Sequence, residues 1–270
     1  MKSKVFSVLG CGWLGLPLAE ALIEDDFTVK GSTTSVEKCE LLLSKDIQPY
    51  VLIIDEDIEG NLEHFLQADI LFINVPFRKQ KPFLKNYKKL VNAIEISSVE
   101  HVVFISSTSV YPDVNGEVTE DMHFDVNPAK KELIAFENLF LDNPNFNTTI
   151  IRFAGLIGGT RNPGNFFKDD RIVENALAPV NLIHLEDCIG IVKATVKQQK
   201  WNVTYNAAAS THPSKASYYK KATEQLGKKP ATFVEELKTF KVVSNQKLIK
   251  ELNYKFVYPD LIEGLKEFKN

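Results

Sequence analysis

Residues 5–15 of this chain read VFSVLGCGWLG, an apolar run that leads directly into a glycine-rich turn. The turn has the spacing G-x-G-x-x-G, and a segment rich in Leu and Ala follows it. In a strand–turn–helix unit of this kind, the first glycine permits the tight turn, the second lets the backbone approach a pyrophosphate, and the third lets helix and strand pack closely. The amide groups and the dipole at the helix start favour an anion. The stretch predicts a dinucleotide-binding turn, against the alternative of an ordinary tight turn, made by Gly10, Cys11, Gly12, Trp13, Leu14 and Gly15.

The first 155 residues alternate strand-like apolar runs with helical patterns. Runs such as residues 102–105 are apolar throughout, which suits strands that are buried on both faces of a parallel sheet. Alternation of strands and helices implies right-handed crossovers. The predicted fold class is therefore α/β, with a Rossmann-type doubly wound parallel sheet. The predicted strands are 4–9, 27–32, 50–54, 69–74, 101–106 and 148–153, and the predicted helices are 13–24, 36–44, 82–96 and 128–141.

After Gly155 the pattern loosens into shorter elements. The expected strands are 181–185 and 203–207, and the expected helices are 187–199, a segment from Pro213 to about Gly227, 244–252 and 259–268. Ser210 or Thr211 is the expected cap of the Pro213 helix. We therefore predict a dinucleotide-binding domain at residues 1–155. Residues 156–270 are predicted to form a smaller C-terminal substrate lobe, with part of the chain returning to the sheet.

The composition excludes several classes of partner. With 270 residues, 44% of them hydrophobic, the chain is long enough for a sizeable core, and a net charge of −3 gives no reason to expect nucleic acid. No apolar stretch approaches the roughly 20 residues of a membrane span, and no signal peptide is recognised, so we expect a cytoplasmic protein without a membrane partner. The three cysteines are far apart, which predicts neither a disulfide framework nor a metal site. The sequence leaves open whether the protein forms a homo-oligomer.

The end of the second predicted strand bears on the choice of cofactor. An acidic residue about 20 positions after the glycine turn would bind a ribose 2′-hydroxyl, but residues 32–35 read Ser-Thr-Thr-Ser. Hydroxyl groups can donate to a 2′-phosphate, and Lys38 could add positive charge. We therefore predict NADP rather than NAD, bound with the help of Thr33 and Thr34. The alternative is that these hydroxyls only form a local turn and cap the next helix at Ser35.

Two further strand ends are expected to contact the cofactor. Asp55 closes the third strand and could accept a hydrogen bond from an adenine amino group; a solvated strand end is the alternative. Residues Asn74, Val75 and Pro76 close the fourth strand, where the backbone is expected to pass close to the cofactor ribose.

The fifth strand ends in Ile105-Ser106-Ser107-Thr108-Ser109-Val110-Tyr111-Pro112, a polar cluster at a strand's carboxyl end. This segment resembles the S-S-x-x-V-Y-G motif of the extended short-chain dehydrogenase/reductases, the group of sugar-nucleotide epimerases and dehydratases. In that alignment Ser107 matches the family's catalytic Ser or Thr, and Pro112 replaces the usual Gly. The resemblance implies that Ser107 polarises a carbonyl or hydroxyl group of the substrate.

The resemblance covers nearly the whole chain. Residues 149–159 are similar to the family's sixth strand and the loop over the nicotinamide, and residues 180–187 are similar to its I-N-x-I-H-x-x-D segment. Tyr205-Asn206, followed by the Pro213 helix, also matches. The closest pattern is an atypical subgroup whose glycine turn reads G-C-G-x-L-G.

The family's catalytic pair is missing. In the family, a Y-x-x-x-K motif on the helix after the fifth strand supplies a Tyr that transfers a proton and a Lys that lowers the Tyr pKa. Aligning Glu137 on the family's Glu puts Ala129 at the Tyr position and Leu133 at the Lys position. No Tyr of the chain is followed by Lys four positions later, so another register does not restore the motif.

Further residues are candidates for substrate contact. The side chains singled out are Ser109, Tyr111, Arg161, Asn162 and His184. For the loop residues the alternative is a solvated loop, and for His184 it is a hydrogen-bonded structural role. The histidines show no metal-binding spacing such as H-E-x-x-H.

Together these patterns predict an NADP-binding atypical short-chain dehydrogenase/reductase. We expect an oxidoreductase or epimerase-like enzyme that acts on a small carbonyl, hydroxyl or sugar-type substrate, with hydride carried by the nicotinamide. The alternative is a non-catalytic dinucleotide-binding protein with a regulatory or redox-sensing role. The missing Tyr and Lys favour the alternative, whereas the retained Ser107 favours the enzyme.

Overall fold

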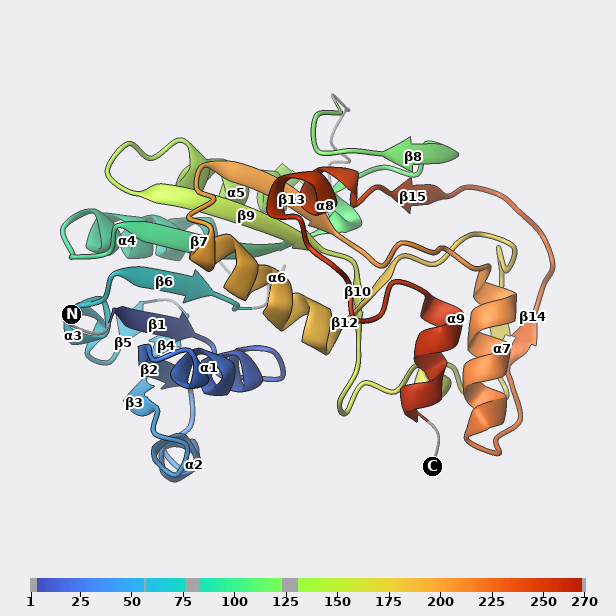
Figure 1. Cartoon of the computed structure of the whole chain (residues 1–270), viewed down its shortest axis with the longest axis horizontal. Coiled ribbons are helices and arrows are strands. Elements are labelled where there is room, and N and C mark those ends of the chain that lie inside the picture. Colours follow the sequence, from blue (N-terminus) through green and yellow to red (C-terminus); the bar gives the residue numbers. More distant parts are fainter. Residues whose placement is uncertain (1–3, 56, 76–82, 123–130, 269–270) are drawn as a thin grey trace. The chain divides into compact units, whose positions relative to one another are not determined.

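The computed structural model describes residues 4–55, 57–75, 83–122 and 131–268 (Figure 1). The chain forms two compact units that interleave along the sequence. The first unit comprises Met1–Ser106, Pro128–Ile151 and Val192–Thr204, and the second comprises Ser107–Asn127, Arg152–Ile191 and Tyr205–Asn270. The predicted boundary between residues 155 and 156 stays a prediction.

A seven-stranded sheet with the order β13-β9-β7-β6-β1-β2-β3 forms the centre of the fold. Its strands are β1 (Val5–Leu9), β2 (Thr28–Thr33), β3 (Gln48–Val51), β6 (Ile70–Ile73), β7 (His101–Ser107), β9 (Asn147–Phe153) and β13 (Val203–Ala207). The pairs β1–β2, β2–β3, β1–β6 and β6–β7 are all parallel. The chain runs outward from β1 to β3 and then returns to β6 on the other side of β1. This reversal confirms the predicted doubly wound α/β fold.

Helices of the first unit pack against this sheet. They are α1 (Gly15–Glu24), α2 (Lys38–Leu43), α3 (Leu62–Phe65), α4 (Phe83–Glu95) and α5 (Lys131–Leu141). One core cluster joins Leu90 and Ile94 of α4 and Phe140 of α5 to Leu71 and Val102 of the sheet. All four residues of β6 are buried, as expected for a strand covered on both faces. Within the described residues, no helix is long and apolar enough to cross a membrane.

The second unit contains the elements that the sequence predicts least well. Three small parallel sheets pair β8 (Gly116–Val118) with β15 (Lys241–Val243), β10 (Gly155–Ile157) with β12 (Leu182–His184), and β11 (Ile172–Val173) with β14 (Thr232–Phe233). The helices are α7 (Lys215–Gln225), α8 (Gln246–Leu252) and α9 (Leu261–Gly264), with short 3₁₀ turns η1 (Thr108–Val110), η3 (Pro163–Asn165) and η4 (Leu265–Phe268); α6 (Leu185–Lys197) spans both units.

Two local expectations were wrong. The predicted strand 50–54 is divided into β3 and β4 (Ile53–Ile54), because the chain leaves the sheet and β4 pairs with β5 (Ile58–Glu59) in antiparallel fashion. The cap of the Pro213 helix is Ser214, whose hydroxyl accepts from the Ser217 amide at 3.2 Å. The expected cap Thr211 instead accepts from the Leu261 amide at 2.9 Å.

Candidate functional site

The three glycines of the turn meet three different steric requirements. Gly10 has φ of +104°, a conformation that L side chains rarely adopt. A Cβ on Gly15 would lie 2.1 Å from the Gly10 carbonyl oxygen, so only glycine lets α1 start so close to the end of β1. A Cβ on Gly12 would meet no heavy atom within 4 Å, so the backbone there faces open space. The tight turn at Gly10 and the close packing at Gly15 agree with the sequence prediction, and the approach of a pyrophosphate to Gly12 stays a prediction.

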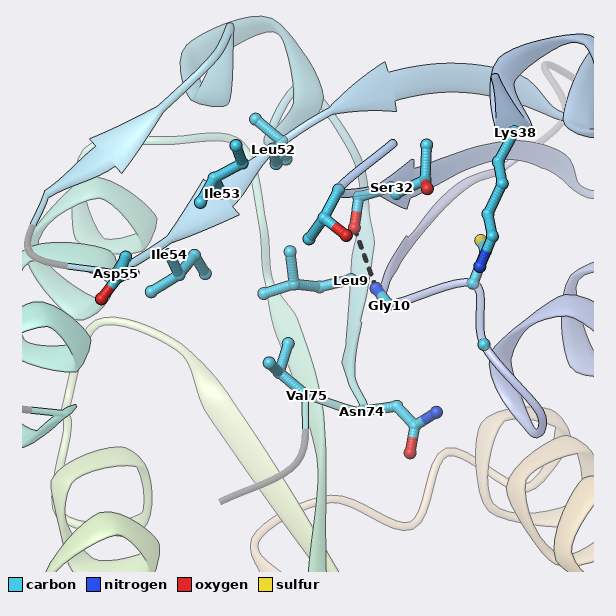
Figure 2. A pocket seen from close by; sticks show the side chains of 14 residues that line it. Leu9, Gly10, Ser32, Lys38, Leu52, Ile53, Ile54, Asp55, Asn74 and Val75 are labelled. Atoms are coloured by element: carbon cyan, nitrogen blue, oxygen red, sulfur yellow. Dashed lines mark hydrogen bonds between the residues drawn. The ribbon is translucent and has the colours of Figure 1, made fainter. Parts of the chain in front are cut away.

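The turn is held by the end of the neighbouring strand β2. The Gly10 amide donates to the Ser32 hydroxyl at 2.9 Å (Figure 2), and the Cys11 amide donates to the Ser32 carbonyl at 2.9 Å. The Gly12 amide closes the turn by donating to the Gly10 carbonyl at 2.8 Å. Ser32 therefore fixes the position of the turn with its side chain and its backbone. The sequence indicates only that Ser32 belongs to a run of hydroxyl residues.

The start of α1 is suited to an anion. The first turn of this fully described helix carries no acidic side chain, and Leu14, at the N-cap position, provides no side-chain cap. Leu14 itself is buried and belongs to the core, whereas Trp13 is half-buried. Negative charge at this helix end would therefore be stabilised by the amide groups and the dipole without competition from an acidic side chain of the first turn.

A pocket of about 290 Å³ opens beside the turn (Figure 2). The predicted cofactor residues that line it are Gly10, Cys11, Gly12, Thr33, Thr34, Asp55, Asn74 and Val75. Residues Gly10, Thr34 and Asn74 follow the carboxyl ends of β1, β2 and β6, so the pocket lies at one edge of the parallel sheet. Within the described part of the chain, Trp13, Leu14 and Gly15 are not among its lining residues. Pro76 lies outside the described residues.

The lining at the end of β2 is polar or positively charged. Thr33 and Thr34 line the pocket together with Lys38, the first residue of α2, whose side chain extends into it (Figure 2). The Thr33 hydroxyl accepts from the Ser35 amide at 3.2 Å, so it forms the local turn of the alternative interpretation and keeps its own hydrogen for donation. The Ser35 hydroxyl donates to the exposed Glu37 carboxylate, and this bond lowers the pKa of Glu37.

The Cys11 thiol adds no charge to the pocket. Burial raises the pKa of Cys11 to about 12, so the thiol stays protonated at neutral pH. A Cβ on Gly31 of β2 would lie 2.7 Å from the Cys11 sulfur, which shows how closely the strand and the turn approach one another.

One wall of the pocket is apolar, and its residues are not among those predicted to contact the cofactor. It is formed by Leu52, Ile53 and Ile54, which lead to Asp55 (Figure 2). Asp55 is the one carboxylate among the described lining residues. It follows β4, so none of the described lining residues at the end of β2 is a carboxylate. The sequence signal for this apolar wall was the apolar run of the predicted strand 50–54. The arrangement fits a flat apolar group on this wall with a polar partner at its end.

In the second unit, Ser107 and Ser109 lie where the strand β7 gives way to η1. The Ser107 hydroxyl accepts from the Ser109 amide at 3.1 Å and caps η1, and both residues are half-buried. An accepted bond leaves the Ser107 hydroxyl hydrogen available to a substrate oxygen. Its predicted catalytic role stays a prediction.

Tyr111 is buried in a polar network rather than exposed. Its hydroxyl accepts from the Arg152 guanidinium at 2.6 Å and donates to the Asn206 side-chain oxygen at 2.8 Å. The Asn206 backbone amide donates to the Glu120 carboxylate at 2.6 Å. Burial raises the pKa of Tyr111, and Arg152 partly offsets that shift. Only 2% of Tyr111 is exposed, so substrate contact through its hydroxyl would require a change in this network.

The remaining candidate substrate residues have structural partners of their own. Arg161 is exposed and forms an isolated bridge with Gly158, and the Asn162 side chain caps η3 by accepting from the Gly164 amide at 2.9 Å. His184 is 2% exposed, and its Nε2 lies 2.5 Å from a carboxylate oxygen of Glu267. Its Nδ1 accepts from the Glu186 backbone amide at 3.3 Å, which fits the hydrogen-bonded structural alternative for His184. Substrate contact by these residues stays a prediction.

The helix α5 carries no cation at the position that aligns with the family's Lys. That position is Leu133, an apolar side chain that is 8% exposed. Ala129 lies outside the described residues. One turn beyond Leu133, the buried Glu137 carboxylate accepts from the Ser106 hydroxyl at 2.5 Å.

Comparison with known proteins identifies the family and the fold. No protein-family model matches the chain. Protein YeeZ of Escherichia coli K12 is 31% identical over 267 residues, which cover 95% of this chain and 97% of YeeZ.

Two solved structures are similar in fold. A short-chain dehydrogenase/reductase superfamily protein from Agrobacterium tumefaciens with bound NAD has a TM-score of 0.75 and 17% identity, over 97% of this chain and 95% of that one. UDP-glucuronic acid 4-epimerase from Bacillus cereus, in complex with UDP-glucuronic acid and NAD, has a TM-score of 0.79 and 18% identity over 97% of both chains. The chain therefore has the fold of the extended short-chain dehydrogenase/reductases and belongs to the family of E. coli protein YeeZ.

Proposed function

We propose that the protein binds NADP(H) in the pocket beside the glycine turn. The observation that carries the proposal is the lining of that pocket, which includes the open Gly12 backbone and the side chains of Thr33, Thr34 and Lys38. A diphosphate would be bound by the amide groups at the start of α1, and an adenine would lie on the wall formed by residues 52–54. The NAD complexes of the similar structures support a nicotinamide dinucleotide.

The preference for NADP follows from charge. A ribose 2′-phosphate beside β2 would contact two hydroxyl donors and the Lys38 ammonium group, which favour an anion there. A carboxylate at this point would repel a 2′-phosphate, and none of the described lining residues from β2 or α2 is acidic.

We further propose that the protein is an oxidoreductase or epimerase-like enzyme of the cytoplasm. Its substrate would be a small carbonyl, hydroxyl or sugar-type molecule. The nicotinamide supplies hydride transfer when it is bound. Ser107 would orient and polarise the substrate oxygen through its hydroxyl hydrogen. The buried Leu133 favours the second candidate, a dinucleotide-binding regulatory protein without turnover, because no lysine stands there to assist a proton donor.

Calorimetry with the variant Gly12→Val tests the binding site. The added side chain should block the diphosphate and weaken NADPH binding about 100-fold, or about 2.7 kcal/mol. The control Gly116→Val adds the same bulk in β8, where a Cβ has no neighbour closer than 4.0 Å, and should bind as the wild type does. Equal affinity for the wild type and a folded Gly12→Val variant would rule out this site.

Turnover separates the two candidate functions. Reduction or epimerisation of a carbonyl or sugar-nucleotide substrate, lost in Ser107→Ala with NADPH affinity unchanged, is the result expected of the enzyme. Tight NADPH binding without turnover over a broad panel of such substrates would favour the regulatory protein.

A further inference from the structure

Three potential metal ligands of the second unit meet at the start of α6. His184 is the last residue of β12, Glu186 lies in the first turn of α6, and Glu267 belongs to η4 near the end of the chain. One ligand atom from each of them lies within 4.8 Å of the other two. Sequence spacing does not show this group, because Glu267 is some 80 positions from the other two residues.

The imidazole of His184 is held in place with Nε2 directed into this group. The ring centroid lies 3.9 Å from that of Tyr258, and a Cβ on Gly158 would lie 2.5 Å from Nε2. Nε2 is buried and makes no hydrogen bond within the described structure. The Glu267 carboxylate oxygen is 2.5 Å away but is not aligned as an acceptor. A buried nitrogen atom next to two carboxylates therefore lacks a well-oriented hydrogen-bond partner.

The electrostatics of the group favour a cation. A neutral imidazole can supply a lone pair to a metal ion through its unprotonated ring nitrogen. The carboxylates of Glu186 and Glu267 lie in the same group, and two nearby negative charges attract a cation. The neighbouring Lys266 is paired with Glu263.

We propose that His184, Glu186 and Glu267 form a zinc-binding site. One imidazole nitrogen and two carboxylate oxygens are donors that Zn²⁺ accepts in tetrahedral sites, and the fourth position would be taken by water. Mg²⁺ and Ca²⁺ prefer oxygen donors alone, which disfavours them here. The site is independent of dinucleotide binding and would join the start of α6 to the C-terminal turn.

Zinc binding requires small adjustments that the structure permits. Ligands about 2.0–2.2 Å from a tetrahedral ion lie roughly 3.4 Å apart, so the Glu267 carboxylate must move outward by about 1 Å. Its side chain is 32% exposed and has room to do so. Coordination through Nε2 also places the ring proton on Nδ1. The long contact of 3.3 Å from the Glu186 amide to Nδ1 would then be given up.

Equilibrium dialysis against buffered Zn²⁺, after treatment with a chelator, tests the site by measuring bound metal per chain. We expect one zinc ion per wild-type chain and at least tenfold weaker binding by Glu267→Gln and Glu186→Gln. Both substitutions are isosteric and affect exposed residues, so the variants should fold. The control Glu263→Gln removes an exposed carboxylate of the same C-terminal segment, outside the group, and should bind zinc as the wild type does.

Two further measurements distinguish zinc bound by these three residues from zinc bound by other side chains. Zinc should raise the melting temperature of the wild type and of Glu263→Gln but not that of Glu267→Gln, because a ligand of the folded state stabilises it. Co²⁺ bound in place of zinc should lack the charge-transfer absorption of thiolate ligands. A wild-type chain that retains no zinc, unchanged binding in both Glu variants, or thiolate absorption would each overturn the proposal.

Discussion

The glycine turn of the first unit and the Tyr111 network of the second unit fix polar groups in opposite ways. The turn presents backbone amides, and its geometry depends on the absence of side chains at Gly10 and Gly15. The Tyr111 network, made of Tyr111, Arg152, Asn206 and Glu120, depends on side chains that must be present. Its members are up to 95 positions apart in sequence. Substitution should therefore harm the turn by adding atoms and the network by removing hydrogen-bond partners.

The largest effect on stability is expected at Gly15. The added methyl group of Gly15→Ala would lie 2.1 Å from the Gly10 carbonyl oxygen, so β1 and α1 would have to move apart. We expect a loss of about 3 kcal/mol or more in the free energy of unfolding, measured by urea denaturation. Gly12→Ala is the matched control, because its methyl group meets open space, and it should lose less than about 1 kcal/mol. Equal losses in the two variants would contradict the steric account of the turn.

Acid should destabilise the second unit through His184. Burial lowers the pKa of His184 to about 4 from its ordinary value of 6.5, so the unfolded chain takes up this proton at a higher pH than the folded protein does. The resulting stability is present in full above pH 6.5 and is lost as the pH falls towards 4. Between about pH 7.5 and about pH 5 the loss is about 2 kcal/mol.

Urea denaturation at these two pH values, with a chelator present, measures that loss. His184→Gln should lose about 2 kcal/mol less than the wild type over the same interval. Equal losses would mean that the Glu267 carboxylate, 2.5 Å from Nε2, keeps the pKa of His184 near its ordinary value.

An effect of similar size is expected in the Tyr111 network. Tyr111→Phe keeps the ring but removes the hydroxyl that accepts from Arg152 and donates to Asn206. Both groups are buried, so we expect a loss of about 1–3 kcal/mol in the free energy of unfolding. A variant as stable as the wild type would show that water or other side chains replace the hydroxyl without cost.

The same contrast explains what the sequence could and could not predict. The sheet and the glycine turn were predictable because their signals are local: apolar runs, and three glycines within six residues. The two-stranded sheet of β8 and β15 could not be predicted, because each strand has only three residues. The paired residues Gly116 and Lys241 are also distant in sequence.

For the site residues too, local signals were predictable from the sequence and contacts between distant residues were not. Thr33 and Asp55 line the pocket because each lies at or beyond a strand end, and their contact with a cofactor stays a prediction. The burial of Tyr111 and the contact between His184 and Glu267 depend on residues that are distant in sequence. A single sequence has no short-range pattern that encodes such contacts.

The most direct test of the account is the affinity of the wild-type protein for NADPH and NADH, measured side by side by calorimetry. The hydroxyls of Thr33 and Thr34 and the Lys38 ammonium group should make NADPH bind about tenfold more tightly, or about 1.4 kcal/mol. Thr33→Asp should erase or reverse this preference through repulsion of the 2′-phosphate, whereas the uncharged control Thr33→Asn should largely keep it. A wild-type protein that binds NADH more tightly, or binds neither dinucleotide, would contradict the account.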